Sequence, residues 1–152
     1  MNFHLAQVNI AKRIAAMDSP VMADFVANLD PINALAEQSD GFVWRLKEDN
    51  DNATAITIFD DEFLIVNMSV WESLGALFKY VYQSGHLQML KRRREWFEKM
   101  PQMHMAMWYL PAGYAPTIAE ATQRIVHLRE HGETPYAFTF KGKFSAPEIC
   151  IG

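Results

Sequence analysis

Two segments of this chain are apolar at nearly every position, whichever side of a strand the position would face. In residues 63–70, FLIVNMSV, and in residues 103–110, MHMAMWYL, neighbouring side chains are apolar on both sides of the expected strand. A solvated face of an antiparallel sheet produces alternating polar and apolar residues instead. We therefore expect both faces of the sheet in this protein to be covered by apolar side chains.

The spacing of apolar residues predicts an alternation of strands and helices. Strands are expected over residues 3–10, 42–47, 54–59, 63–70, 103–110 and 136–140. Helices are expected after Ser19, after Ser69, over residues 86–97 and from Thr117 to Gly132. This order predicts an α+β, ferredoxin-like subunit with a mostly antiparallel sheet and helices on one face.

Helix boundaries are suggested by local motifs. Ser19 is expected to cap a helix that Pro20 begins, and Pro31 is expected to kink or restart it. Ser69 and Glu72 have the spacing of a capping box, which predicts a helix start within that segment.

The second face of the sheet needs a cover that the predicted helices do not supply. A second copy of the sheet would supply it, and we therefore predict a homodimer closed sheet against sheet. The alternative is a monomer whose C-terminal helix folds over the open face. Residues 1–140 are expected to form one domain, followed by a tail at 141–152.

Composition bounds the class of protein. With 152 residues, half of them hydrophobic, the chain has the size of one compact domain. A net charge of −4 gives no general attraction to nucleic acid or to an anionic membrane. The single cysteine, Cys150, excludes an internal disulfide framework, so a reducing cytoplasm is the expected location. No secretion signal or membrane-spanning segment is predicted.

Residues 86–97, HLQMLKRRREWF, give the strongest indication of a functional site. On a helix, His86 and Arg93 fall on the same otherwise apolar stripe. A buried guanidinium needs an anionic partner or a wet cavity, so Arg93 either pairs with a carboxylate such as Asp24 or Glu148 or binds an anionic ligand. For His86 the alternatives are a local hydrogen bond to the backbone and a role facing a ligand.

Other polar and aromatic side chains are candidates for the same site. Asn67 lies amid apolar neighbours on its strand, and a buried amide needs a partner. The four tryptophans are expected either in the core or as walls of a substrate site; they are Trp44, Trp71, Trp96 and Trp108.

Several kinds of chemistry lack support in the sequence. There is no nucleophile elbow, no glycine-rich phosphate loop and no evident pairing of cysteine with histidine. The histidines are scattered over different elements, and only His127 and His131 have helical i, i+4 spacing. No metal site is therefore predicted, and hydrolase and kinase activities are not favoured.

The stretch NMSVWESLGALFKYVYQSGHLQML resembles the dimeric α/β-barrel superfamily, which includes the antibiotic biosynthesis monooxygenases. The segments HLAQVNIAK, GHLQMLKRRREWF, WYLPAGYAPT and YAFTF resemble an uncharacterised bacterial family of that superfamily, a domain of unknown function. The resemblance extends nearly to Phe140. It implies a ferredoxin-like subunit, a dimeric barrel and a pocket between sheet and helices.

The haem-degrading branch of that superfamily is matched at only one of three positions. Asn9 stands where its asparagine is expected, but Tyr80 and Leu90 stand at the positions of its tryptophan and histidine. The leading hypothesis is a cofactor-independent oxygenase of an apolar or aromatic small molecule. His86 or Asn9 would deprotonate or orient the substrate, and Arg93 would steady the developing oxyanion.

Three alternatives to an oxygenase remain open. The first is a non-catalytic dimeric module that binds an apolar acid through Arg93. The others are a haem-binding relative and a structural dimer without a pocket. A haem-binding relative would use His86 as an iron ligand.

Overall fold

The computed structural model describes residues 2–47, 58–59, 61, 63–142 and 144. Its strands are β1 (Phe3–Arg13), β2 (Phe42–Arg45), β3 (Leu64–Trp71), β4 (Phe97–Glu98) and β5 (Met105–Pro111). Its α-helices are α1 (Ala23–Glu37), α2 (Leu74–Gln83), α3 (His86–Lys91) and α4 (Ile118–His131), and short 3₁₀ turns span Pro20–Met22 and Arg93–Glu95. The predicted α+β class is confirmed.

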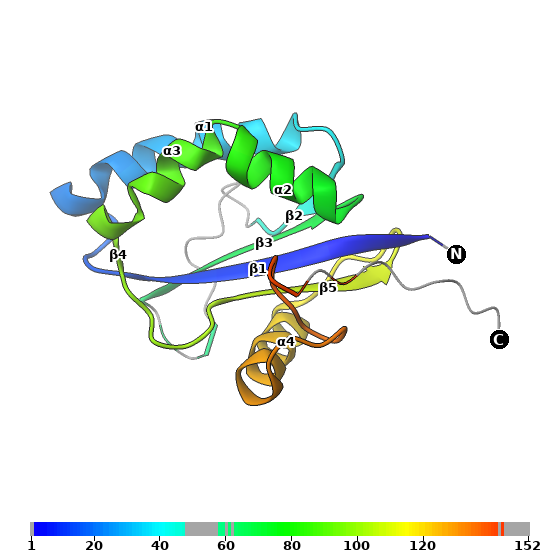
Figure 1. Ribbon diagram of the computed structural model, residues 1–152. Coiled ribbons are helices and arrows are strands. Elements are labelled where there is room, and N and C mark those ends of the chain that lie inside the picture. Colours follow the sequence, from blue (N-terminus) through cyan, green and yellow to red (C-terminus); the bar gives the residue numbers. More distant parts are fainter. Residues whose placement is uncertain (1, 48–57, 60, 62, 143, 145–152) are drawn as a thin grey trace.

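The strands form one antiparallel sheet with β1 near its centre (Figure 1). One edge of β1 pairs with β3 along eight residues, and β2 pairs with the outer edge of β3. The other edge of β1 pairs with β5, and its last residues pair with β4. The resulting order β5-β1-β3-β2 is the ferredoxin-like arrangement that the sequence predicts.

Helices cover both faces of this sheet, so the prediction that all helices lie on one face is wrong. Figure 1 shows α1, α2 and α3 on one face and α4 on the other. The inward residues of α4 are fully or almost fully buried; they are Ala121, Ile125 and Leu128. They belong to one apolar cluster with Val8 and Trp108 of the sheet. Because α4 covers this face, the predicted homodimer is no longer needed to cover exposed apolar side chains there. The homodimer itself stays a prediction.

The starts of α1 and α2 differ from the predicted ones. Pro20 begins a 3₁₀ turn that leads into α1, with Ser19 at its N-cap position, but the Ser19 hydroxyl donates to the Ala16 carbonyl and makes no capping hydrogen bond. The helix α1 continues through Pro31, which is exposed. Ser69 lies inside β3 and opens no helix. Ser73 caps α2 instead, because its hydroxyl accepts a hydrogen bond from the Ala76 amide.

The strand predicted at residues 136–140 is also wrong. Within the part of the chain that the structure describes, the segment makes only isolated bridges, from Phe138 to Met107 of β5 and from Ala137 to Thr134. Phe138 is fully buried and packs against Tyr109 and Phe144, so its apolar pattern reflects core packing rather than sheet pairing. Most of the strand predicted over 54–59, and most of the tail at 141–152, lies outside the described residues.

Membrane insertion through a helix finds no support in the fold. No described helix combines the length and the apolar character that crossing a bilayer requires.

Gly41 joins α1 to β2 at a close approach of two elements. Its φ is +82°, and a Cβ added there would lie 2.5 Å from the Cβ of Ala76 in α2. Left-handed backbone costs a non-glycine residue roughly 1–2 kcal/mol, and overpacking adds roughly 1–3 kcal/mol. We expect Gly41→Ala to lower the free energy of unfolding by about 3 kcal/mol, measured by urea denaturation.

Gly113 provides the matched control for this substitution. Its φ is +90°, but an added Cβ would meet no atom within 4 Å. Gly113→Ala therefore carries only the backbone cost, about 1 kcal/mol. Equal losses in the two variants would contradict the proposed clash with α2.

Candidate functional site

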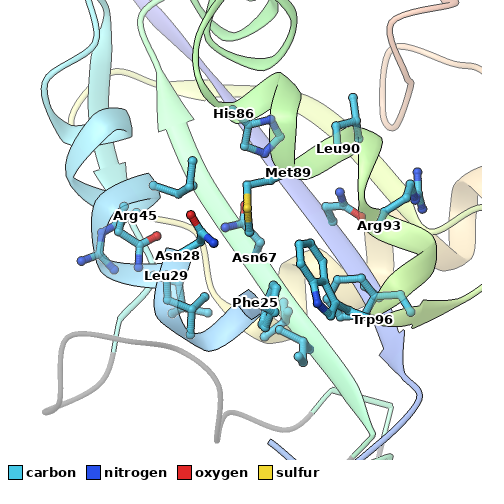
Figure 2. Close-up of a pocket in the computed structure, with 18 residues that line it drawn as sticks. Phe25, Asn28, Leu29, Arg45, Asn67, His86, Met89, Leu90, Arg93 and Trp96 are labelled. Carbon is cyan, nitrogen blue, oxygen red and sulfur yellow. The ribbon is translucent and has the colours of Figure 1, made fainter. Parts of the chain in front are cut away.

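A cavity of about 190 Å³ lies between the sheet and the helices α1 and α3 (Figure 2). Its walls are mainly apolar and aromatic; they include Phe25, Leu29, Ile32, Met89, Leu90 and Trp96. Its polar lining residues are Asn9, Asn28, Asn33, Arg45, Asn67, His86 and Arg93. A cavity of roughly 150 Å³ holds a benzene ring, so this one suits a compact organic molecule.

The segment 86–97 lines the cavity with the residues that the sequence predicts, although it is not one helix. The helix α3 ends at Lys91, and a 3₁₀ turn leads into β4. The turn is tied to α1 because the Arg92 guanidinium lies 2.7 Å from Asp24 and 2.8 Å from Glu95. These two carboxylates raise the pKa of Arg92.

His86 projects from the start of α3 toward Met89 (Figure 2). Its Nδ1 lies 3.4 Å from the Val81 carbonyl oxygen. A carbonyl only accepts hydrogen bonds, so this contact favours a proton on Nδ1 and leaves the lone pair on Nε2. Burial lowers the pKa of His86 below its usual value, although the Val81 contact opposes the shift. His86 is therefore neutral at pH 7 and has the form of a general base.

Arg93 contacts a second histidine rather than a carboxylate. Its Nη2 lies 3.2 Å from Nε2 of His104. Burial and the Arg93 charge both lower the pKa of His104, so that ring is neutral and accepts the hydrogen bond. The predicted partner Asp24 pairs with Arg92 instead, and Glu148 lies outside the described residues. No described carboxylate lies within ion-pair distance of Arg93.

Asn9 and Asn67 bring two side-chain amides to the floor of the cavity. They are directly opposed on β1 and β3, so both side chains leave the same face of the sheet. The Oδ1 of Asn67 accepts a hydrogen bond of 2.8 Å from Gln7 Nε2. The Oδ1 of Asn9 is buried and finds no hydrogen-bond partner among the described residues.

The predicted tryptophan walls are divided between the cavity and the core. Trp96 lines the cavity, and its ring centroid lies 5.6 Å from that of Phe25. Trp71 instead stacks on Tyr80, while Trp108 and Trp44 belong to the apolar layer on the α4 face. Trp44, Trp71 and Trp108 do not line the cavity. Strand parity decides this outcome for Trp108, because its side chain leaves the sheet on the face opposite the cavity.

Three polar lining residues were not predicted from the sequence. Asn28 and Asn33 come from α1, where Asn28 shares a helical stripe with Phe25, Leu29 and Ile32. An amide on an otherwise apolar helical stripe is a pattern from which Asn28 could have been predicted as a lining residue. Arg45 is only 7% exposed and lies 3.7 Å from Glu37. Its burial depends on the pairing of β2 with β3, which the sequence does not give.

Metal coordination gains no support from the clustering of side chains. No group of three or more histidine, cysteine, aspartate or glutamate side chains comes together among the described residues.

Comparison with known proteins gives one family and two solved structures. Comparison with curated proteins gives no match. The structures are of SnoaB, a cofactor-independent oxygenase from Streptomyces nogalater, and of a mutant of it. They are 19% and 18% identical to this chain, with TM-scores of 0.45 and 0.46, and each comparison covers 74% of this chain and 95% of the other. The model of the family described as Domain of unknown function (DUF3291) matches residues 4–150, and this chain therefore belongs to that family.

Proposed function

We propose that this protein is a small-molecule enzyme that binds a compact apolar or aromatic acid in the cavity and removes a proton from it through His86. The reaction that we assign is a cofactor-independent oxygenation, in which the deprotonated substrate itself reacts with oxygen. SnoaB, whose solved structures are similar to this chain, is a cofactor-independent oxygenase.

One observation carries this proposal: the composition of the cavity lining. A neutral histidine, two arginines and four asparagines meet apolar walls, and the described lining contains no carboxylate. Arg45 is paired with Glu37, whereas Arg93 contacts a neutral histidine. Such a lining favours an anionic or strongly hydrogen-bond-accepting group on an otherwise apolar ligand.

The proposed reaction balances without an external reductant. A substrate methylene flanked by carbonyl groups loses one proton to His86 Nε2, and the resulting enolate donates electrons to O₂. One oxygen atom stays on that carbon as a carbonyl, and the other leaves as water. The methylene thereby loses both hydrogens and supplies all four electrons that reduce O₂.

Isotope labelling tests the oxygenation. We would incubate the protein with 1,3-indandione under ¹⁸O₂, at a pH where the free compound is neutral, and follow the product by mass spectrometry. The proposal expects one ¹⁸O atom at the methylene carbon at a rate above that of buffer. Related diketones and hydroxyaromatic acids extend the panel. Binding of these compounds without incorporation into any of them would instead support a non-catalytic binding module.

Arg93 is expected to bind the anionic group of the ligand. A hydrogen bond to a charged group contributes roughly 1.5–3 kcal/mol, so we expect Arg93→Met to weaken benzoate binding by about 10- to 100-fold. Isothermal titration calorimetry measures this change. The neighbouring Arg94 is exposed and does not line the cavity, so Arg94→Met is the control. Equal affinities in the two variants would rule out this role for Arg93.

A haem-binding function fits the cavity poorly. His86 would supply a lone pair on Nε2, but the cavity of about 190 Å³ is only slightly larger than the one that holds benzene. A porphyrin is several times larger than benzene. We therefore assign no step to haem.

A further inference from the structure

A row of hydrogen bonds runs beneath the cavity, across β1 and β3. The indole Nε1 of Trp71 donates to Ser69 Oγ at 2.8 Å. Gln7 Nε2 donates to the same hydroxyl at 2.7 Å and to Asn67 Oδ1 at 2.8 Å. Trp71, Ser69 and Gln7 are between 1% and 7% exposed. The row therefore begins in the core and ends at Asn67, which lines the cavity.

This row sets the direction of the Asn67 amide. Both hydrogens of Gln7 Nε2 are used, one by Ser69 and the other by Asn67. With its oxygen engaged by Gln7, Asn67 has its Nδ2 left to meet a ligand. An amide nitrogen only donates hydrogen bonds, so it favours an accepting oxygen and disfavours a donor.

We propose that Gln7 is a positioning residue that holds the Asn67 Nδ2 toward the cavity, so that the site recognises its ligand by an anionic oxygen such as a carboxylate or an enolate. This inference rests on the proposed function and adds the chemical group that Asn67 recognises. Gln7 does not line the cavity, and it acts through Asn67. A donor held in place before binding stabilises developing negative charge without reorganising.

Amide proton exchange tests the direction without any ligand. NMR of the free protein should show the side-chain NH₂ protons of Gln7 protected from exchange with water, because both are hydrogen-bonded in the interior. The Asn67 NH₂ protons should exchange rapidly. Protected Asn67 protons with exposed Gln7 protons would mean that both amides point the other way, and this result would overturn the proposal.

Two probes of similar shape test whether the direction of the Asn67 amide affects ligand binding. Benzoate oxygens only accept hydrogen bonds, whereas the hydroxyl of benzyl alcohol donates or accepts and is indifferent to the Asn67 direction. Gln7→Met keeps the side-chain length and removes the amide. We expect it to weaken benzoate binding about 10-fold, as loss of one hydrogen bond to a charged group does. Binding of benzyl alcohol should change by less than about 2-fold.

Gln123→Met is the matched control for Gln7→Met, because Gln123 is exposed on α4 and does not line the cavity. It makes the same substitution outside the hydrogen-bonded row, so benzoate affinity should stay close to wild type. Equal weakening of both probes in Gln7→Met would show a merely structural role for Gln7 and would overturn the inference. If wild-type protein binds neither probe, the proposed function fails, whereas the exchange pattern still decides the Asn67 direction.

Discussion

Replacing His86 by glutamine is expected to lower kcat for 1,3-indandione by about 10²- to 10⁴-fold, the range for loss of a general base. His86 is the proposed base because Nδ1 faces the Val81 carbonyl, which leaves the lone pair on Nε2. Glutamine keeps a polar side chain of similar reach, so affinity for benzoate should change by less than about 3-fold. Steady-state kinetics and calorimetry separate the two effects.

The control for His86 is His131, whose side chain is 57% exposed and lies on α4. His131→Gln should leave kcat unchanged. Wild-type kcat in His86→Gln would remove the proposed base from the mechanism.

The pH dependence gives a further check on His86. Burial lowers its pKa below the usual 6.5, and the active form is the unprotonated one. The rate of oxygenation should therefore fall only as the pH drops below 6.5. The unfolded chain binds this proton more readily than the folded one, so the His86 contribution to stability is fully present above pH 6.5 and declines as the pH falls toward the folded pKa.

Ile125→Ala is expected to lower the free energy of unfolding by about 3 kcal/mol, within the range for isoleucine truncation in a core. Ile125 is fully buried in the cluster that joins α4 to the sheet. Removing three carbons there loses apolar burial and leaves a cavity. Urea denaturation monitored by circular dichroism measures the change.

The exposed residue Gln123 on the same helix supplies the control. Gln123→Ala should change stability by less than about 0.5 kcal/mol. A similarly small loss for Ile125→Ala would mean that α4 does not cover this face in solution, and the sheet would again need a second copy as its cover. Native mass spectrometry of the same samples measures the oligomeric state.

The sequence predicted much of the site because helical periodicity survives local irregularity. His86 and Arg93 were placed on one stripe, and both line the cavity although α3 ends at Lys91. Asn67 was found because it is an amide on an apolar strand, whereas Asn9 was found only through its match to the asparagine of the haem-degrading branch. Arg45 was missed because its position depends on which strand β2 pairs with.

The tryptophans show the limit of composition as a guide. Aromatic side chains serve equally well as core and as ligand walls, and their chemistry does not distinguish the two. Only the side of the sheet from which a side chain emerges decides between them. Trp108 emerges under α4, whereas Trp96 emerges beside Phe25 in the cavity.

The sequence by itself determined the α+β class, the antiparallel sheet and the need to cover both of its faces. These features follow from local periodicity and from the cost of exposing apolar surface. The identity of the cover, the partner of Arg93 and the direction of the Asn67 amide were decided only by the tertiary structure. Each depends on contacts between residues far apart in the chain, and local propensity contains no information about such pairs.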